Sequence, residues 1–315
     1  MINSDLISKY PLRQQDQATI RRNATWYSKI RPLIEDMREL PYALIKGEAL
    51  SIAAYGDNGF RASKDIDLLV PRDQLGNLQE IFEKHDCKQV IKDESGAVRE
   101  LTRQEKIMLM NSHQVAPYSL VLDDGTFIDI DVNCDIFWGE HIGPRIDLHD
   151  FLKNAVNQVI YGYEIKVLPP IEAFVQVCLH HYREMNSMYI FKLQNPINVS
   201  MFQDIYAFYK SSFRSHIKPL VEYSLHHQLH AYIYYLLYYS SLIFEDDLLP
   251  LHMELFETKE GRKLIHHYGL AAEERKQWKI SFCDRLNHPD LFSVIEPELT
   301  DADQEKIKMS LSIKC

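Results

Sequence analysis

The fold is decided by two runs, Lys64-Asp65-Ile66-Asp67-Leu68-Leu69-Val70 and, further along the chain, Phe127-Ile128-Asp129-Ile130-Asp131-Val132. Both are apolar β-forming stretches that carry aspartates at alternate positions. Residues i and i+2 of a strand point to the same face, so each run is expected to hold two carboxylates side by side. Placing such charges in an Ile/Leu/Val strand costs several kcal/mol unless they are neutralised. A divalent cation is the simplest neutraliser, and the two runs therefore predict a metal site.

Composition narrows the class of protein. The chain has 315 residues, 46% hydrophobic and 25% charged, which is typical of a globular protein long enough for two domains. The formal net charge of -10 argues against an extended nucleic-acid interface but allows a local basic pocket for one nucleotide. The five cysteines are scattered without a Cys-x-x-Cys, and the N-terminal residues do not resemble a signal peptide, so a cytoplasmic location is expected.

The N-terminal half alternates helical and strand patterns. Helices are expected at 13–40, 48–55 and 73–85, the last with Asp73 as N-cap, and strands at 42–45, 65–70 and 87–91. Asp123-Asp124-Gly125 between 120–122 and 126–132 predicts a hairpin, and Gly162 predicts a second one within 158–167.

Helical patterns dominate from Pro169 to the end of the chain. They cover residues 171–185, 200–213, 217–244 with a break, 248–259, 271–286 and 301–311. The most apolar window, 229–244, is too short to cross a bilayer and predicts a buried helix, so no membrane partner is expected. The expected fold class is α+β: a mixed sheet with flanking helices in domain 1–168, followed by a helical domain, 169–315.

The aspartates point to metal-assisted chemistry. A free aspartate has a pKa near 3.9, so all of them would be ionised at neutral pH and would repel one another if crowded together. Mg²⁺ prefers oxygen ligands and is usually held by one or two carboxylates together with substrate phosphates. Three carboxylates could hold two such ions about 3.5–4 Å apart, which suits a phosphoryl-type displacement.

Three segments together resemble the bacterial nucleotidyltransferase-like family of the polymerase-β-type superfamily. They are Ile45-Lys46-Gly47-Glu48-Ala49-Leu50, the string Arg61-x-Ser63-x-Asp65-Ile66-Asp67-Leu68-Leu69-Val70, and Ile130-Asp131-Val132-Asn133-Cys134-Asp135-Ile136. The superfamily pattern is a glycine turn, an Asp-x-Asp strand and a third carboxylate on a neighbouring strand. The resemblance continues through helical segments and spans roughly residues 40–210.

The resemblance implies a role for each matching residue. Asp65 and Asp67 would hold Mg²⁺ or Mn²⁺, and Asp131 would be the third carboxylate, close to the attacking hydroxyl. Asp129, on the same face of that strand, is a rival for this role and a further candidate metal ligand. The nucleotide would be bound by four residues of the turn and the following loop: Lys46, Gly47, Arg61 and Ser63.

The resemblance also implies an activity. A nucleoside monophosphate would pass from an NTP, with ATP preferred, to a hydroxyl or phosphate of a small molecule, glycan or peptide, releasing pyrophosphate. The helical domain would line the cleft and choose the acceptor. Two positions depart from the family: Glu48 follows the turn glycine where glycine or serine is common, and Asn133 stands where histidine is common. These departures leave open a relative that binds nucleotide or protein without catalysis. A toxin-like enzyme that modifies protein or tRNA is a further alternative.

Simpler roles are open for several of these residues. The aspartates could be solvated acids at a strand end or on an edge hairpin. The adjacent pairs His180/His181, His226/His227 and His266/His267 lack the i, i+4 spacing of a helical metal pair. Asp204, on an apolar helix face, could reach the active cleft or cap a neighbour.

Overall fold

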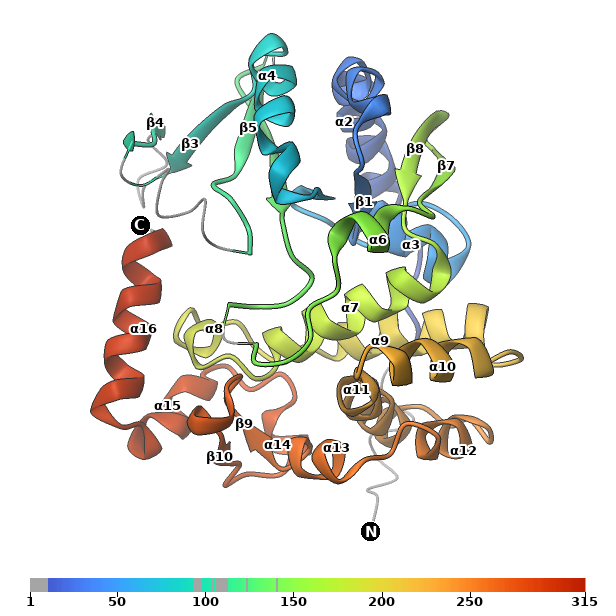
Figure 1. Ribbon diagram of the computed structural model, residues 1–315, viewed down its shortest axis with the longest axis vertical. Coiled ribbons are helices and arrows are strands. Elements are labelled where there is room, and N and C mark those ends of the chain that lie inside the picture. Colours follow the sequence, from blue (N-terminus) through green and yellow to red (C-terminus); the bar gives the residue numbers. More distant parts are fainter. Residues whose placement is uncertain are drawn as a thin grey trace. The chain divides into compact units, whose positions relative to one another are not determined.

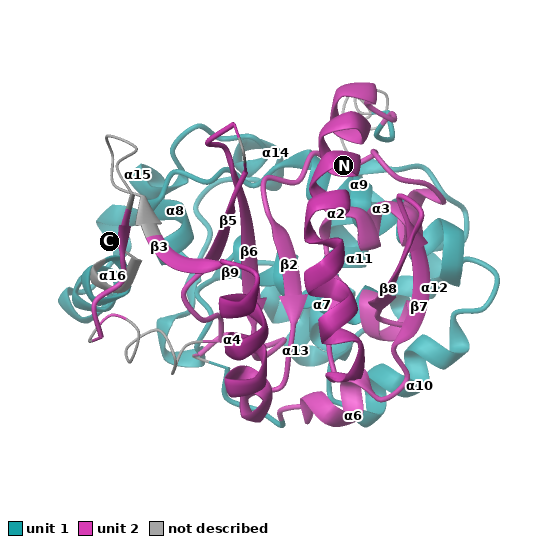
Figure 2. Cartoon of the chain, turned by 90° about the horizontal axis from the view of Figure 1, so that it is seen from above, with its two compact units in different colours: residues 1–13, 140–144, 174–314 teal, residues 14–139, 145–173, 315 magenta. Residues whose placement is uncertain are grey.

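The computed structural model describes residues 11–92, 98–103, 105, 113–122, 124–139 and 141–314. These residues divide into two compact units, coloured separately in Figure 2. The first, here called the α/β unit, comprises residues 14–139 and 145–173 in their described parts. The second, the helical unit, comprises residues 11–13, 141–144 and 174–314. The division into domains 1–168 and 169–315 stays a prediction.

A mixed sheet forms the centre of the α/β unit. Its eight strands, within the described ranges, follow the order β4-β3-β5-β6-β2-β1-β8-β7. The two ends of this order, β4-β3 and β8-β7, are labelled in Figure 1. The strands are β1 (Ala43–Ile45), β2 (Ile66–Leu69), β3 (Lys88–Lys92), β4 (Val98–Glu100), β5 (Tyr118–Val121), β6 (Phe127–Asn133), β7 (Val156–Ile160) and β8 (Tyr163–Val167). β2 runs parallel to β6 and antiparallel to β1. The predicted hairpins are confirmed as the antiparallel pairs β5–β6 and β7–β8, and with them the α+β class.

Helices of the α/β unit pack on the sheet. They are α2 (Gln17–Asp36), α3 (Gly47–Tyr55), α4 (Leu75–Lys84) and α6 (Leu148–Leu152). Apolar residues of α2 and α4 share one core with alternate residues of the two central strands: Ile66, Leu68, Ile128, Ile130 and Val132. Because neighbouring residues of a strand point to opposite faces, the aspartates between these core residues point away from that core.

The predicted N-cap at Asp73 is wrong. After Pro71 the chain first makes a short 3-10 turn, η2 (Arg72–Gln74), and α4 begins only at Leu75. The N-cap of α4 is Gln74, whose side chain makes no capping hydrogen bond. The Asp73 carboxylate instead lies 2.9 Å from a ring nitrogen of His149.

Helices make up most of the helical unit. Their bounds are α7 (Pro170–Glu184, whose first residues belong to the α/β unit), α8 (Met188–Lys192), α9 (Val199–Phe208), the π-helical turn η3 (Tyr209–Phe213), α10 (Lys218–His226), α11 (His230–Ile243), α12 (Leu249–Glu254), α13 (Lys259–Leu264), α14 (Phe282–Arg285), α15 (Leu291–Ile295) and α16 (Asp301–Lys314). The apolar window is confirmed as a helix, α11. In the part of the chain that the structure describes, no helix has both the length and the hydropathy needed to cross a membrane.

The helix predicted over 271–286 is wrong. This stretch holds a 3-10 turn, strand β10 (Lys276–Gln277), which pairs with β9 (His267–Tyr268), and the single helical turn α14. Gly269 allows the chain to fold back here because its φ is +98° and a Cβ would lie 2.7 Å from the carbonyl oxygen of Glu274. Such a turn needs glycine, and its effect on the chain direction outweighs the local helical pattern.

Candidate active site

The two aspartate runs are brought together by the pairing of β2 with β6. In this parallel pair Asp67 lies directly opposite Asp131. Asp65 directly precedes β2, and Asp129 lies two residues before Asp131, so alternation directs all four side chains to one face. Adjacent strands are about 4.8 Å apart, which makes the four aspartates near neighbours. They are called the acidic group below.

The electrostatics of Asp65 reflect this crowding. Burial, together with the negative charges of Asp67, Asp131 and Asp129, raises the pKa of its carboxyl to about 6, although the positive charge of Lys46 opposes this rise. A carboxyl pKa above its usual range means that ionisation is unfavourable in the absence of a cation. The acidic group therefore holds more negative charge than its own surroundings compensate.

Lys46 is paired with one member of the acidic group. Its ammonium donates a hydrogen bond to Oδ1 of Asp67 at 2.7 Å, and both side chains are largely buried. The Nδ2 of Asn133 lies 3.4 Å from the same oxygen and 3.3 Å from the carbonyl oxygen of Leu68. Sequence reasoning noted Asn133 only as a departure from its family; here its amide holds the Asp67 carboxylate in place.

Asp129 has a different neighbour. The hydroxyl of Ser119, opposite it on β5, donates a hydrogen bond to its Oδ1 at 2.5 Å. Ser119 was not singled out from the sequence, although the predicted hairpin brings it into this position. The two aspartates of β6 therefore have different surroundings. Asp129 is oriented by β5, whereas Asp131 lies opposite Asp67 on β2.

The turn before α3 places glycine and serine against each other. Gly47 has φ +37°, and a Cβ added to it would lie 3.0 Å from the Oγ of Ser63. The carbonyl oxygen of Ser63 accepts a hydrogen bond of 2.5 Å from Arg22 Nη2. The guanidinium of Arg22 in turn stacks 4.7 Å above the ring of Trp26. Glycine at position 47 thus lets the loop that leads into β2 approach the start of α3.

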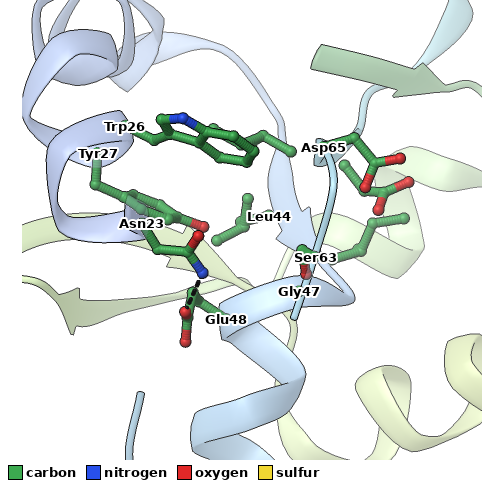
Figure 3. Close-up of a pocket in the computed structure, with 11 residues that line it drawn as sticks. Asn23, Trp26, Tyr27, Leu44, Gly47, Glu48, Ser63 and Asp65 are labelled. Atoms are coloured by element: carbon green, nitrogen blue, oxygen red, sulfur yellow. Dashed lines mark hydrogen bonds between the residues drawn. The ribbon is translucent and has the colours of Figure 1, made fainter. Parts of the chain in front are cut away.

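A small hollow opens beside this turn (Figure 3). Its lining includes Trp26, Tyr27, Gly47, Ser63, Asp65 and Asp67, contributed by α2, the turn, the loop and β2. Arg61 is half-buried in the same loop and does not belong to the described lining. Of the residues predicted to bind the nucleotide, Gly47 and Ser63 thus share one hollow with two metal candidates.

Glu48 also lines this hollow, and its carboxylate belongs to a buried network. Its side chain is only 1% exposed. Oε1 accepts hydrogen bonds from Asn23 Nδ2 (2.5 Å) and the Tyr161 hydroxyl (2.8 Å), and Oε2 accepts one from the Gly59 amide (3.0 Å). Figure 3 shows the bond to Asn23. Glu48 thus joins α3 to α2, to the β7–β8 turn and to the loop, and its carboxylate oxygens accept hydrogen bonds from these three partners.

The remaining candidates have local roles. Asp204 is fully buried in α9 and accepts a hydrogen bond from Arg13 Nε at 2.9 Å, with His181 Nε2 4.0 Å away. Asp124 accepts a hydrogen bond from the Thr126 amide at 2.9 Å, as a turn residue does. Asp123 lies outside the described residues.

The donor set of the acidic group suits a hard divalent cation, because carboxylate oxygens on adjacent strands are what Mg²⁺ and Mn²⁺ bind. Among the described residues, no three His, Cys, Asp or Glu side chains are already gathered as they would be around an ion. The Lys46 ammonium instead supplies positive charge at Asp67. Holding a metal therefore requires side-chain rearrangement within the acidic group and no change of strand register.

Comparison with known protein families shows the family to which the chain belongs. The profile of a family described as uncharacterised nucleotidyltransferase matches residues 7–245. The chain belongs to this nucleotidyltransferase family. The match includes the whole acidic group, the turn at Gly47 and the first helices of the helical unit.

Solved structures similar to this chain have low sequence identity. An antigenic nucleotidyltransferase-like protein from Paracoccidioides brasiliensis is 14% identical over 71% of this chain and 94% of its own, with a TM-score of 0.32. JHP933 from Helicobacter pylori is 13% identical over 80% of this chain and 94% of its own, with the same TM-score of 0.32. Neither likeness is close enough to assign site residues. Among curated proteins none matches this chain.

Proposed function

We propose that this chain is a metal-dependent nucleotidyltransferase of the polymerase-β type that transfers a nucleoside monophosphate from an NTP, preferably ATP. The single observation that carries the proposal is the pairing of Asp67 with Asp131 across β2 and β6. It aligns an Asp-x-Asp motif with a third carboxylate on one face of a sheet, beside a glycine turn. The family assignment supports the same reaction class.

The acidic group is assigned to the metal. Asp65, Asp67 and Asp131 would hold Mg²⁺ or Mn²⁺, with Asp129 as a further ligand. When bound, the ion neutralises phosphate charge and polarises the reacting phosphoryl group. The acceptor oxygen forms a bond to the α-phosphorus as the bond to the pyrophosphate oxygen breaks. Asp131 takes the proton of an acceptor hydroxyl, since its place opposite Asp67 puts it beside the metal ligands.

The nucleotide is assigned to the glycine turn and its surroundings. Backbone amides at the start of α3 suit a phosphate, because the first amides of a helix have no partner within the helix. Lys46 supplies a point charge, Ser63 a hydroxyl at Gly47, and Arg61 a guanidinium suited to bidentate phosphate contacts. Glu48 does not oppose this arrangement because its carboxylate is bound within the network of Asn23 and Tyr161.

The net charge of the chain favours one class of acceptor. A formal net charge of -10 disfavours a long polyanion, so a hydroxyl or phosphate of a small molecule, glycan or peptide is preferred.

The experiment compares the wild-type protein with Asp67→Ala. Both are incubated with Mg²⁺, ATP labelled at its α-phosphate, and a cell extract separated into small-molecule and macromolecular fractions. We expect label transfer and pyrophosphate release in the wild type, and turnover lower by on the order of 10²–10³ in the variant. Label on protein or tRNA would favour the toxin-like alternative over a small acceptor.

A thermal-shift assay with ATP and Mg²⁺ is run in parallel on both proteins, because a ligand that binds the native state raises the melting temperature. ATP-dependent stabilisation without pyrophosphate release from any fraction would favour a nucleotide-binding relative without catalysis. Equal turnover of wild type and variant would contradict the proposed site.

A further inference from the structure

A positively charged side chain of the protein, Lys46, already contacts the acidic group. The Lys46 ammonium lies 2.7 Å from Oδ1 of Asp67, and only 16% of the Lys46 side chain and 7% of the Asp67 side chain are exposed. The charge of Lys46 also opposes the rise in the pKa of Asp65. Lys46 thus acts on both members of the Asp-x-Asp motif. A metal ligated by Asp67 and this ammonium would compete for the same carboxylate.

The backbone at Lys46 is unusual for a residue with a side chain. Its φ is +54° and its ψ is -146°, a region populated almost exclusively by glycine. Holding a non-glycine residue there costs about 1–3 kcal/mol, and such strain persists only where the surroundings impose it. The next residue, Gly47, also has positive φ and begins α3. The turn therefore places the ammonium of Lys46 at Asp67 and the first amides of α3 next to it.

We infer that Lys46 is the counter-ion of the metal-free site and moves from Asp67 to the nucleotide phosphates when metal and nucleotide bind. This inference rests on the proposed function. A divalent ion at Asp67 would lie within a few ångströms of the ammonium, and two positive charges so close repel strongly in a buried site. Metal alone must displace Lys46 without compensation. Metal with a triphosphate offers the ammonium a new anionic partner.

The binding of metal and of nucleotide is therefore coupled. If ATP increases the affinity for the metal, the metal must increase the affinity for ATP by the same factor. We expect the wild-type protein to bind Mn²⁺ weakly by itself and at least about tenfold more tightly with ATP, the lower part of the range typical of coupled sites. The coupling should depend on Lys46 and not on the net charge of the chain.

The test measures Mn²⁺ binding, without any turnover. Free Mn²⁺ is followed by electron paramagnetic resonance, with correction for the Mn²⁺ that ATP binds in solution. The proteins are the wild type, Lys46→Met and the matched control Lys64→Met, which removes the same charge from an exposed position next to Asp65. We expect Lys46→Met to bind Mn²⁺ alone at least about tenfold more tightly than the wild type and to show less ATP enhancement. Lys64→Met should behave as the wild type.

Other outcomes overturn the inference. If Lys46→Met binds Mn²⁺ alone no better than the wild type, the metal does not have to displace Lys46. The same conclusion follows if Lys64→Met shows the same gain in affinity. Should Lys46→Met fail to fold, the wild-type measurement decides: equal affinity for Mn²⁺ with and without ATP also overturns the inference.

Asp67→Asn separates this result from a failure of the proposed function. If wild type and Asp67→Asn bind Mn²⁺ equally with ATP, the metal site itself is wrongly assigned. If Asp67→Asn weakens Mn²⁺ binding but Lys46→Met leaves it unchanged, the metal site is supported and only the inference about Lys46 fails.

Discussion

The hydroxyl of Tyr161 donates a hydrogen bond of 2.8 Å to Oε1 of Glu48, a residue 113 positions away in the chain. Tyr161 and Gly162 form the β7–β8 turn, with φ values of +49° and +86°. Turns with two positive φ values usually hold asparagine or aspartate before the glycine, and a tyrosine there is strained. Its bond to a buried carboxylate offsets that strain and ties the turn to α3.

Removing this bond should destabilise the protein. Tyr161→Phe keeps the ring and takes one donor from a buried carboxylate. We expect the free energy of unfolding to fall by about 1.5–3 kcal/mol, the range for hydrogen bonds to charged groups. Urea unfolding followed by circular dichroism measures the change. Tyr163→Phe, the same substitution two residues later on β8, is the matched control and should change little. A Tyr161→Phe protein as stable as the control would show that Glu48 does not need the hydroxyl.

The raised pKa of Asp65 predicts a stabilising substitution. The pKa is about 6 in the folded protein against an ordinary value of 3.8, so the folded state binds the proton more tightly than the unfolded state. Ionisation of Asp65 therefore destabilises the fold, starting near pH 4, with its full effect above about pH 6. In the metal-free protein, Asp65→Asn should raise the free energy of unfolding by about 2 kcal/mol near pH 8.

The pH dependence is the decisive part of that experiment. The gain from Asp65→Asn should shrink as the pH falls from about 6 toward 4 and vanish below about 4, where the wild-type carboxyl becomes protonated in both states. Thermal unfolding in the presence of a chelator measures it. Asp150→Asn on α6, at an exposed position, is the control and should show no comparable gain. A gain of equal size at both pH values would point to packing and not to charge.

Much of the sheet could be predicted because its signals are local. Alternating aspartates and apolar residues in β2 and β6, and Asp-Gly and Gly162 at the hairpin turns, each depend on a few neighbouring residues. The error over 271–286 shows the limit of such signals. A helical pattern there is overridden by the turn at Gly269, whose need for glycine comes from the backbone of Glu274 across the turn.

Within the candidate site, the sequence indicated which acids matter but not how they are held. Glu48 was noted only as a departure from the family, because its partners Asn23 and Tyr161 are distant in sequence and meet it only in the folded chain. Asn133 and Ser119 were missed as partners of Asp67 and Asp129 for a related reason. Cross-strand contacts follow from register, and register depends on pairing that no single segment specifies.

A buried ion pair in the helical unit gives a separate prediction. Arg13 donates to Asp204, whose side chain is 1% exposed. Removing one partner of a buried pair leaves an uncompensated charge, which typically costs about 3–5 kcal/mol. Arg13→Met should lower the free energy of unfolding by about 3 kcal/mol, and Asp204→Asn should lower it less because the charge left behind, on Arg13, is 23% exposed and can be hydrated. Chemical denaturation measures both. Arg21→Met, at an exposed position of α2, is the control, and a loss as small as the control's would contradict the assignment.

The last prediction decides between the two aspartates of β6. Asp131 lies opposite Asp67, whereas Asp129 accepts a hydrogen bond from Ser119 on β5. If Asp131 is the general base of the proposed transfer, Asp131→Asn should lower kcat by about 10²–10⁴, the usual contribution of such a group. Asp129→Asn should lose much less, because Asp129 is only a further metal ligand in the proposed site and its carboxylate is oriented by Ser119.

Two measurements distinguish a base from a residue that only positions others. The part of the acidic limb of the kcat against pH profile that reports the base should disappear in Asp131→Asn and persist in Asp129→Asn, since the base must be deprotonated to act. Ser119→Ala removes this hydrogen bond from Asp129 without changing the charge of Asp129, and it should leave that limb and kcat close to those of the wild type. If Asp129→Asn removes the limb while Asp131→Asn retains it, proton transfer belongs to Asp129, and Ser119 is then the residue that orients the base.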